Sequence, residues 1–516
     1  MLNEKGGHMA IAGTDHFSLG VELEMPTADA STGATHPVRG FFANLAHILA
    51  DQGLTQGLTQ GLTTQLLRGN GRDYGLRSPR GVHSMDNGFN NLESSLGPVA
   101  AAENSLDTLA AMIRREIRDV SAALAREGAM LVNFSEHPDV VVDEDFYFAH
   151  RAPKALYDYQ ILHRGWNHMS GFDAKAQNSP STGLDFSRAV SGLNCLLALA
   201  PAFIALYANS PFEAGILTPN KENRLTIWPR QLDCSRMPGD RKLHRAPRQP
   251  FRNLADYLTW MFGPDTQMWF AEQSGQGKSI SQAFLAPGDP PLLAFLRNGP
   301  RWVVPYGPGN AKIVAPSIRH LEDHQFAQYG DCRLRYAFAD PPPELERFLV
   351  LLDEQPDQLE TFFQAHTAYC YLEGRAAGAT FADQELLDLA GEKVGASAAV
   401  SPSALQYGLL RDLDRTKRLV ASHTWSEWIG LREQAVRNAL DGELGGIKLR
   451  QVCAAVLEIV GNALAADQDW MLAYPLWVLR SGKTGADRAL DRYARSSGPP
   501  TQRLRELILS RRVIPV

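Results

Sequence analysis

The sequence predicts an α+β fold in which isolated strands alternate with amphipathic helices and the chain ends in a helical region. Three observations lead to this class. Residues 16–25 alternate apolar and polar side chains, residues 105–128 repeat apolar side chains at three- and four-residue steps, and the composition after Ser403 favours helices. These strands and helices do not follow one another in the regular series of a parallel β/α sheet, so a mixed arrangement is expected.

The first predicted strand lies in residues 16–25. Leu19, Val21 and Leu23 face one way along it, as in a half-buried strand. Farther along, residues 52–63 repeat the tetrapeptide Gln-Gly-Leu-Thr, which is too short for a solenoid and too rich in glycine for a firm helix. We expect a loop or a frayed helix end there.

A predicted amphipathic helix follows between Ser105 and Gly128. Its apolar residues fall on one face that can pack on a sheet, and Gly128 is a suitable stop. Residues 130–134 are then expected to form another strand. The most apolar stretch, residues 193–208, is shorter than the roughly 20 residues needed to span a bilayer, so it predicts a buried helix.

The amino-acid composition changes twice in the second half of the chain. Residues 238–316 are rich in Pro, Gly, Arg and aromatic residues, which predicts long loops and short helices, with residues 287–308 as a candidate lid. Beyond Ser403, helices are expected over residues 405–419, 425–440, 449–464, 486–493 and 502–509. We therefore divide the chain into a leader (1–15), a core (16–400) and a C-terminal helical region packed on that core (401–516).

Composition excludes several classes of protein. The chain has 516 residues, 44% of them hydrophobic, so it can bury a large core without staples. Its net charge of −6 argues against nucleic acid as a partner. The five scattered cysteines fit free thiols in a reducing compartment, and the N-terminus has no secretory pattern, so a cytoplasmic protein without a membrane partner is expected.

Two glutamates in the first strand form the first candidate site. Glu22 and Glu24 are one residue apart and so project from the same face. Like charges held this close repel unless a cation lies between them, and carboxylate oxygens suit Mg²⁺. Glu93, which follows a turn beginning at Asp86, could add a third carboxylate. The alternative is ordinary surface charge, with Asp86 as a turn residue.

A second candidate site combines a helix end with arginines. The apolar helix ends in Asn209 and Ser210, which place polar donors at a bend. Arg224 and Arg236 follow, and each offers a fork of donors for a carboxylate or a phosphate. The alternative is a helix terminator followed by surface arginines.

Several short motifs together resemble the glutamate-cysteine ligase superfamily, most closely its plant and proteobacterial branch. The order and approximate spacing of the motifs match over residues 17–464, and five in register make coincidence improbable. These motifs are Gly20–Glu24, Leu184–Ser187, Ala208–Phe212, Asn223–Trp228 with Asp233–Arg236, and Tyr407–Asp412.

That resemblance implies a glutamine-synthetase-like core, a curved and largely antiparallel sheet with flanking helices. It implies an enzyme that joins a carboxylate to an amine through an acyl phosphate, most simply glutamate to cysteine in glutathione biosynthesis. The implied cofactors are ATP and about two or three Mg²⁺ ions, with Mn²⁺ as an alternative. Glu22, Glu24 and Glu93 would be metal ligands, and Arg224, Arg236, Asn209 and Ser210 would lie where substrate or phosphate binds.

The resemblance also implies a strand bearing Glu-x-Arg beside an arginine-bearing strand. Residues 369–376 resemble the first, with Glu373 as a further metal ligand and Arg375 as a catalytic residue. Residues 329–336 resemble the second, with Arg333 catalytic and Arg335 binding substrate or phosphate. Which strand carries the family arginine stays open, and an insertion between residues 340 and 366 is assumed.

Some features depart from the family pattern. Residues 178–183 carry small side chains where two amides are expected, so the substrate pocket could differ. The alternatives are therefore a ligase of the same fold acting on another acid and amine or on a peptide tail, and a catalytically inactive relative. His168 could contact a nucleotide, although a structural histidine is the simpler interpretation. The oligomeric state is not defined.

Overall fold

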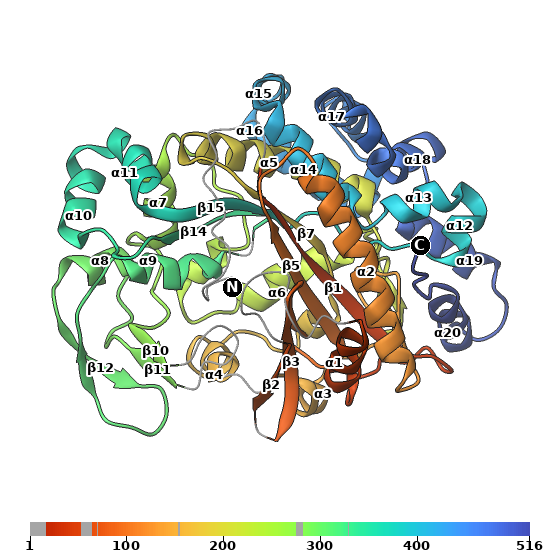
Figure 1. Cartoon of the computed structure of the whole chain (residues 1–516), viewed down its shortest axis with the longest axis horizontal. Helices are drawn as coiled ribbons and strands as arrows, with labels where there is room; N and C mark the ends of the chain where they lie inside the picture. Colours follow the sequence, from red (N-terminus) through yellow and green to blue (C-terminus); the bar gives the residue numbers. More distant parts are fainter. Residues whose placement is uncertain (1–16, 53–63, 70, 153–154, 275–281, 329) are drawn as a thin grey trace.

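The computed structural model of the chain describes residues 17–52, 64–69, 71–152, 155–274, 282–328 and 330–516 (Figure 1). The predicted leader, residues 1–15, lies outside the described residues. So does the tetrapeptide repeat from residue 53 to residue 63.

A large antiparallel sheet occupies the centre of the protein (Figure 1). Every strand pair recorded in it is antiparallel, which confirms the predicted α+β class with a largely antiparallel sheet. The strand order is β14 (Cys332–Phe338), β15 (Thr367–Gly374), β7 (Asn178–Gly183), β1 (Leu19–Asp29), β5 (Asn91–Val99), β4 (Gly81–Met85), β3 (Arg72–Ser78) and β2 (Gln65–Gly69), and β6 (Ala129–Leu131) pairs with the far end of β1.

The two faces of this sheet differ in chemistry. Leu19, Val21 and Leu23 of β1 are buried on one face, as the alternation in the sequence predicts. Helices α2 (Ser105–Ala125), α5 (Phe186–Tyr207) and α14 (Ser401–Arg411) pack on the sheet. Because side chains alternate along each strand, the polar residues between these apolar ones project from the opposite face.

Helix α5 is a long and largely buried helix of the core. It spans 22 residues, six more than the predicted apolar stretch, and it is long and apolar enough by composition to cross a membrane. However, 89% of its apolar window is buried inside the protein. The prediction of a buried helix is confirmed, whereas its predicted length was too short because Phe186–Gly192 continue the same helix.

Residues 238–316 contain more regular structure than predicted. They form the short helices α7 (Leu254–Phe262) and α8 (Leu292–Arg297), as expected. They also form a four-stranded sheet, which the loop prediction missed: β10 (Glu272–Ser274), β11 (Gln282–Leu285), β12 (Arg301–Pro305) and β13 (Lys312–Val314). Strands of three to five residues are too short to show periodicity among so many prolines and glycines. The candidate lid, 287–308, holds α8 and β12, whose Phe295 and Val303 are buried in the core.

Two helices connect β14 to β15. Helix α10 (Leu345–Glu354) and helix α11 (Leu359–His366) fill the long segment between the two strands. The strands themselves are adjacent, with Arg333 opposite Glu373. The wide sequence separation of these two residues therefore does not separate them in space.

The C-terminal residues are largely helical, and most predicted helices there are present. The expected helix over residues 405–419 is instead two helices, because Asp412 caps the second one by accepting a hydrogen bond from the Arg415 amide. The helices are α14, α15 (Leu413–Val420), α16 (Trp425–Asn438), α17 (Leu449–Ala463), α18 (Ala473–Ser481), α19 (Gly485–Arg495) and α20 (Pro500–Ser510), of which α18 was not predicted.

Candidate active site

The polar face of the large sheet carries acidic and basic side chains side by side. Glu24 of β1 lies opposite Glu93 of β5. On the other side of β1, Glu22 lies opposite Ser179 of β7, and Ser181 of β7 lies opposite Glu373 of β15. These registers place all four predicted metal-ligating glutamates on one face.

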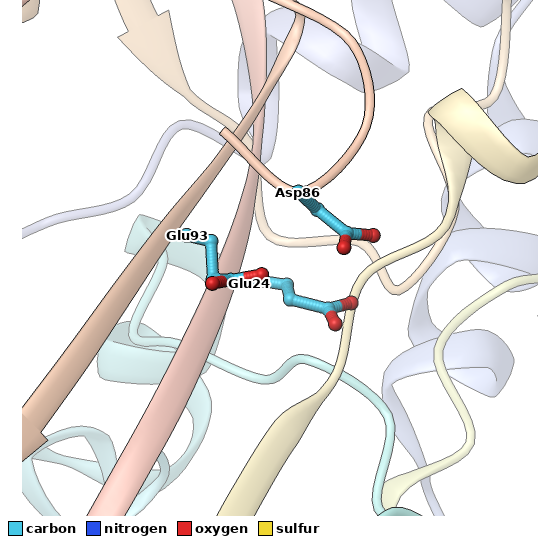
Figure 2. Close-up of side chains that lie close together, drawn as sticks. All are labelled: Glu24, Asp86 and Glu93. Atoms are coloured by element: carbon cyan, nitrogen blue, oxygen red, sulfur yellow. The ribbon is translucent and has the colours of Figure 1, made fainter. Parts of the chain in front are cut away.

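Three carboxylates form a compact cluster at one end of this face (Figure 2). Glu24, Asp86 and Glu93 each offer an oxygen, and these oxygens lie within 4.8 Å of one another. Glu24 and Glu93 come from paired strands, whereas Asp86 comes from the turn between β4 and β5. Glu24 is 2% exposed and Glu93 is 8% exposed, so the cluster is held largely away from water.

Burial and mutual repulsion act on these carboxylates. Burial, opposed by Lys175 and reinforced by Asp86, raises the pKa of Glu24 to about 7. Burial also raises the pKa of Glu22, and the charges of Glu373 and Glu93 raise it further. Burial is the largest cause of both shifts, so the charged forms of Glu22 and Glu24 are costly.

The turn that carries Asp86 is tied to the segment before β7. The side chain of Asn87 donates to the carboxylate of Asp173, and the amide group of Asn90 donates to the Asp173 carbonyl over 2.8 Å. Asn91 likewise donates to the Lys175 carbonyl over 2.6 Å. Short polar side chains favoured in turns thus fix the position of Asp86.

Lys175 supplies a positive charge inside the acidic cluster. Its Nζ lies 3.1 Å from both carboxylate oxygens of Glu24 and 2.8 Å from Oδ2 of Asp86. Burial alone would lower the pKa of Lys175, but Asp86 and Glu24 raise it. The ammonium therefore stays charged.

Glu373 is surrounded by arginines. Arg333 donates from Nε to its Oε2 over 2.9 Å, and Arg375 donates to its Oε1 over 2.8 Å. Arg335 approaches to 4.0 Å. Burial would raise the pKa of Glu373, but these guanidinium groups outweigh burial and hold the pKa well below its usual range. The predicted Glu-x-Arg strand and arginine strand thus meet at one carboxylate.

Other predicted site residues lie in a buried hydrogen-bonded hub. Arg224 is fully buried; it donates to Glu222 over 2.5 Å and to the Ala376 carbonyl over 2.7 Å. Glu222 also accepts from the backbone amide of Asn209 over 2.7 Å and from the hydroxyl of Ser210 over 3.1 Å. These three predicted residues contact protein groups and hold the chain that follows β15.

The hub extends to the C-terminal tail. The side chain of Asn209 accepts a 2.6 Å hydrogen bond from Arg511, which also donates to the Asn133 carbonyl over 2.7 Å. Arg511 is fully buried and lies 3.3 Å from Asp383. The tail of the chain thus helps to hold the helix end that the sequence singled out.

The remaining candidates lie elsewhere. Arg236 is exposed and donates to the Leu162 carbonyl over 2.9 Å. The ring of His168 lies 5.0 Å from that of Tyr147 and 5.4 Å from that of Phe148, and burial lowers its pKa. Neither residue is among the charged neighbours that shift the pKa values of Glu22, Glu24 or Glu373.

Sequence reasoning missed two residues of the acidic cluster. The sequence favours a turn role for Asp86. Its position in the turn that leads into the strand of Glu93 was a usable signal that the two carboxylates lie close together. Lys175 lies in no motif, and nothing in its local sequence shows that its ammonium reaches Glu24. Only the pairing of β7 with β1 brings the segment before β7, which carries Lys175, next to Glu24.

The acidic cluster fits a divalent cation. Mg²⁺ prefers hard oxygen ligands and commonly binds one or two carboxylates together with substrate phosphates. Glu24, Asp86 and Glu93 offer such oxygens within 4.8 Å of one another. Burial first, and then the charges of Asp86 and Glu93, raise the pKa of Glu24, so a bound cation would stabilise its charged form. Lys175 neutralises only part of this charge.

A protein-family model matches the N-terminal part of the chain. Residues 18–261 match the model of the glutamate-cysteine ligase family 2 (GCS2). Those residues include Glu22, Glu24, Asp86 and Glu93. No curated protein matches the chain.

Two solved structures are similar to the chain. A glutamate-cysteine ligase from Francisella tularensis, in complex with AMP, is 11% identical with a TM-score of 0.47, and the match covers 96% of this chain and 88% of that one. A bifunctional glutathione synthetase from Pasteurella multocida is 14% identical with a TM-score of 0.40, covering 96% of this chain and 52% of that one. The chain thus spans about half the length of the second protein.

Both structural matches are distant, so the family model carries the assignment. It covers β1, β5 and the acidic turn between β4 and β5, which together form the carboxylate cluster. Over residues 18–261, fewer than half of its 516 residues, the chain is similar to glutamate-cysteine ligase family 2.

Proposed function

We propose that the protein is a Mg·ATP-dependent ligase that joins the γ-carboxylate of glutamate to the amine of cysteine through an acyl phosphate. The observation that carries this proposal is the placement of acidic and arginine clusters on one face of the sheet. Glu24, Asp86 and Glu93 lie at one end, and Arg333, Arg335 and Arg375 gather around Glu373 at the other. Phosphoryl transfer from a nucleoside triphosphate uses both carboxylates, which hold metal ions, and cationic side chains, which contact the phosphates.

The acidic end is proposed to hold the divalent cations. Glu24, Asp86 and Glu93 would bind one ion, and Glu22, whose pKa responds to both Glu93 and Glu373, lies between the two clusters and would contribute to another. Bound Mg²⁺ would neutralise phosphate oxygens and stabilise the charge of phosphoryl transfer. The role of Lys175 is to keep two ligands close together when metal is scarce.

The basic end is proposed to orient the transferred phosphoryl group and the carboxylate substrate. Arg333 and Arg375 are held by Glu373, so their guanidinium groups are ordered before substrate arrives. Arg335 keeps buried donor atoms without a hydrogen-bond partner, which a bound anion could accept from. In this assignment Glu373 orients arginines, which is an alternative to its predicted role as a metal ligand.

The buried hub is proposed to act indirectly, by positioning residues that contact the substrate. Arg224 donates to the carbonyls of Arg375 and Ala376, so it fixes the backbone beside the Arg375 side chain. Asn209 and Ser210 support Arg224 through Glu222. Positioning accounts for these residues better than the direct substrate contact expected from the sequence, because their polar atoms contact protein groups. Arg236 stays a candidate for substrate contact from the surface.

The identity of the substrates is the finer part of the proposal. Similarity to the family over residues 18–261 supports glutamate and cysteine, small-molecule substrates in a cytoplasmic enzyme of glutathione biosynthesis. The strand β7 has serines at positions 179 and 181, opposite Glu22 and Glu373, where the sequence departs from the family pattern. Small side chains at this position leave room for a different acid or amine, so another substrate pair is the second candidate.

A phosphate-release assay tests both candidates. The enzyme is given Mg²⁺, ATP and glutamate, and each of a panel of amines that includes cysteine is added in turn. Release that depends on cysteine, with γ-glutamylcysteine detected by mass spectrometry, supports the proposal. Release with another amine supports the second candidate, and no release with any acid and amine pair would support a catalytically inactive relative.

A further inference from the structure

A cavity of about 520 Å³ is lined by residues outside the carboxylate cluster. Its walls come from the loop before α1 (Phe41–Asp51), the start of β3 and the end of α3 (Glu144–His150). The lining residues are Thr35, Pro37, Arg39, Arg72, Phe146, Ala149 and His150. None of the proposed catalytic or metal-binding residues lines it.

The polar groups of this cavity are mainly cationic. Arg72 uses one nitrogen to donate to the Val38 carbonyl over 2.7 Å. Among the described residues, the side chains of Arg39 and His150 take part in no recorded hydrogen bond or ion pair, although the His150 ring contacts Phe146 at 4.7 Å. The cavity therefore presents donors that the protein itself does not use.

The carboxylate of Glu127, whose charge acts on Arg72, is already engaged. Oε2 of Glu127 accepts from the backbone amide of Gly40 over 2.7 Å, and its Oε1 lies 3.1 Å from Nε2 of His36. Glu127 acts on Arg72 only at a distance. Its negative charge is thus directed at the start of α1, and it does not line the cavity.

The pKa shifts of the cavity residues agree with a site that favours an anion. Burial lowers the pKa of Arg72, and the neighbouring Arg39 lowers it further. Burial likewise lowers the pKa of His150, and both arginines add to this effect. The two guanidinium groups repel each other, so an anion between them would be stabilised by both, and His150 can add a ring N–H donor.

We propose that this cavity is a second ligand site that binds a small doubly charged anion, a phosphate monoester or a dicarboxylate. Two guanidinium forks suit the paired oxygens of either group. The volume of about 520 Å³ falls within the range of small-molecule pockets. Pro37, Phe146 and Ala149 supply an apolar wall for the carbon part of the ligand.

The site is connected to the acidic turn through Phe89. The guanidinium of Arg72 lies 3.2 Å from the centroid of the Phe89 ring. The Phe89 amide donates to the His150 carbonyl over 2.8 Å, and the Phe89 carbonyl accepts from the Val38 amide over 2.8 Å. Occupation of the cavity therefore steadies Phe89, which is three residues from Asp86.

Calorimetric titration of the full-length protein tests the site. Inorganic phosphate and succinate are titrated separately in buffer that holds EDTA and no nucleotide, which keeps the proposed catalytic chemistry silent. The wild type should bind at least one probe, and Arg39→Gln should weaken that binding about tenfold or more, as expected for a lost charge-assisted hydrogen bond. Because Arg39 is exposed, its substitution should leave the fold intact.

Two controls locate the ligand. Arg68→Gln removes an arginine from the β2–β3 hairpin that also carries Arg72. The Arg68 side chain is 72% exposed and pairs with Asp73, so this variant should bind like the wild type. Glu93→Gln alters the carboxylate cluster and should also leave anion binding unchanged. Binding of phosphate alone, succinate alone or both identifies the ligand chemistry within the proposal.

Three results would overturn the site. They are the absence of binding of either probe to the wild type, equal affinity in the wild type and Arg39→Gln, and loss of binding in Glu93→Gln. A second readout is hydrogen exchange of the Phe89 amide, which should slow when the wild type is saturated with the anion and should not change in Arg39→Gln at the same concentration.

Discussion

The ammonium of Lys175 is bound by the carboxylate of Glu24, with both oxygens 3.1 Å from Nζ. The same nitrogen lies 2.8 Å from Asp86, and the lysine side chain is 1% exposed. The rings of Phe172 and Trp228 lie 4.9 Å and 5.3 Å from it. An internal cation therefore lies among the carboxylates that we propose as metal ligands, so ammonium and metal ion stabilise the same charges.

Replacing Lys175 by Met should make the stability of the protein depend on metal. Without the ammonium, the buried carboxylate of Glu24 loses its cationic partner, which costs about 3–5 kcal/mol of unfolding free energy. Urea unfolding in EDTA should show this loss, and millimolar Mg²⁺ should recover much of it because a cation then replaces the ammonium.

The matched control is Lys312→Met, which removes an exposed lysine paired with Glu272. Its stability should change little and should not respond differently to Mg²⁺. If Lys175→Met loses the same unfolding free energy with and without Mg²⁺, the carboxylates do not bind a metal ion.

The sequence was sufficient for the parts of the fold that depend on local periodicity. The alternation in β1 and the apolar repeat in α2 are both found in the structure, because burial of one face imposes that pattern on the chain. The strands of the four-stranded sheet escaped prediction, since β10 and β13 have only three residues each. Short strands depend on their neighbours more than on their own sequence.

In the candidate site, too, local geometry could be predicted from the sequence, whereas tertiary contacts could not. Glu22 and Glu24 share a face because strand geometry requires it, and that inference needed no tertiary information. Whether Arg224 contacts a ligand or the protein could not be predicted, because its partners Glu222, Gln177 and Ala376 converge only in the folded chain. Residue type predicted what this guanidinium could bind, but burial decided which partner it meets.

Glu22→Gln should abolish turnover and leave the fold intact. The amide has nearly the shape of the carboxylate but no charge, so a ligand for a cation is lost while packing stays the same. Stability should rise slightly or stay unchanged, because burial and the charges of Glu373 and Glu93 already make the Glu22 carboxylate costly. Phosphate release and circular dichroism are measured together on the same preparation. Release at the rate of the wild type would remove Glu22 from the proposed metal site.

Glu373→Gln should destabilise the protein, in contrast to Glu22→Gln. The substitution leaves Arg333, Arg335 and Arg375 without their shared carboxylate, and removing one partner of a buried pair costs about 3–5 kcal/mol. Added sulfate should restore part of this loss, since an anion can take the place of the carboxylate. The control is Glu272→Gln, at an exposed pair. An unchanged urea midpoint for Glu373→Gln would show that the three arginines do not depend on Glu373.

Glu116→Gln should flatten the acid limb of the stability curve. Glu116 is fully buried beneath the sheet, where its Oε1 lies 2.8 Å from Nδ1 of His83 and accepts from Ser94 over 2.7 Å. Burial would raise its pKa, but His83 and Arg80 outweigh it and lower the pKa from 4.5 to about 2. A lowered folded-state pKa means that the carboxylate stabilises the protein above pH 4.5 and that this contribution is lost as the pH falls towards 2. About 3 kcal/mol is at stake, by the usual conversion of a pKa shift.

Urea unfolding between pH 6 and pH 3 measures the effect of Glu116, and the exposed Glu103 provides the matched substitution to Gln. The wild type and Glu103→Gln should lose stability in parallel as the pH falls below about 4.5, because both keep a carboxylate that the unfolded chain protonates first. Glu116→Gln should be less stable at pH 6 and should lose less on acidification, so its curve approaches that of the wild type at pH 3. Parallel curves for all three proteins would show that the acid sensitivity arises elsewhere and that the ion pairs of Glu116 contribute nothing that depends on its charge.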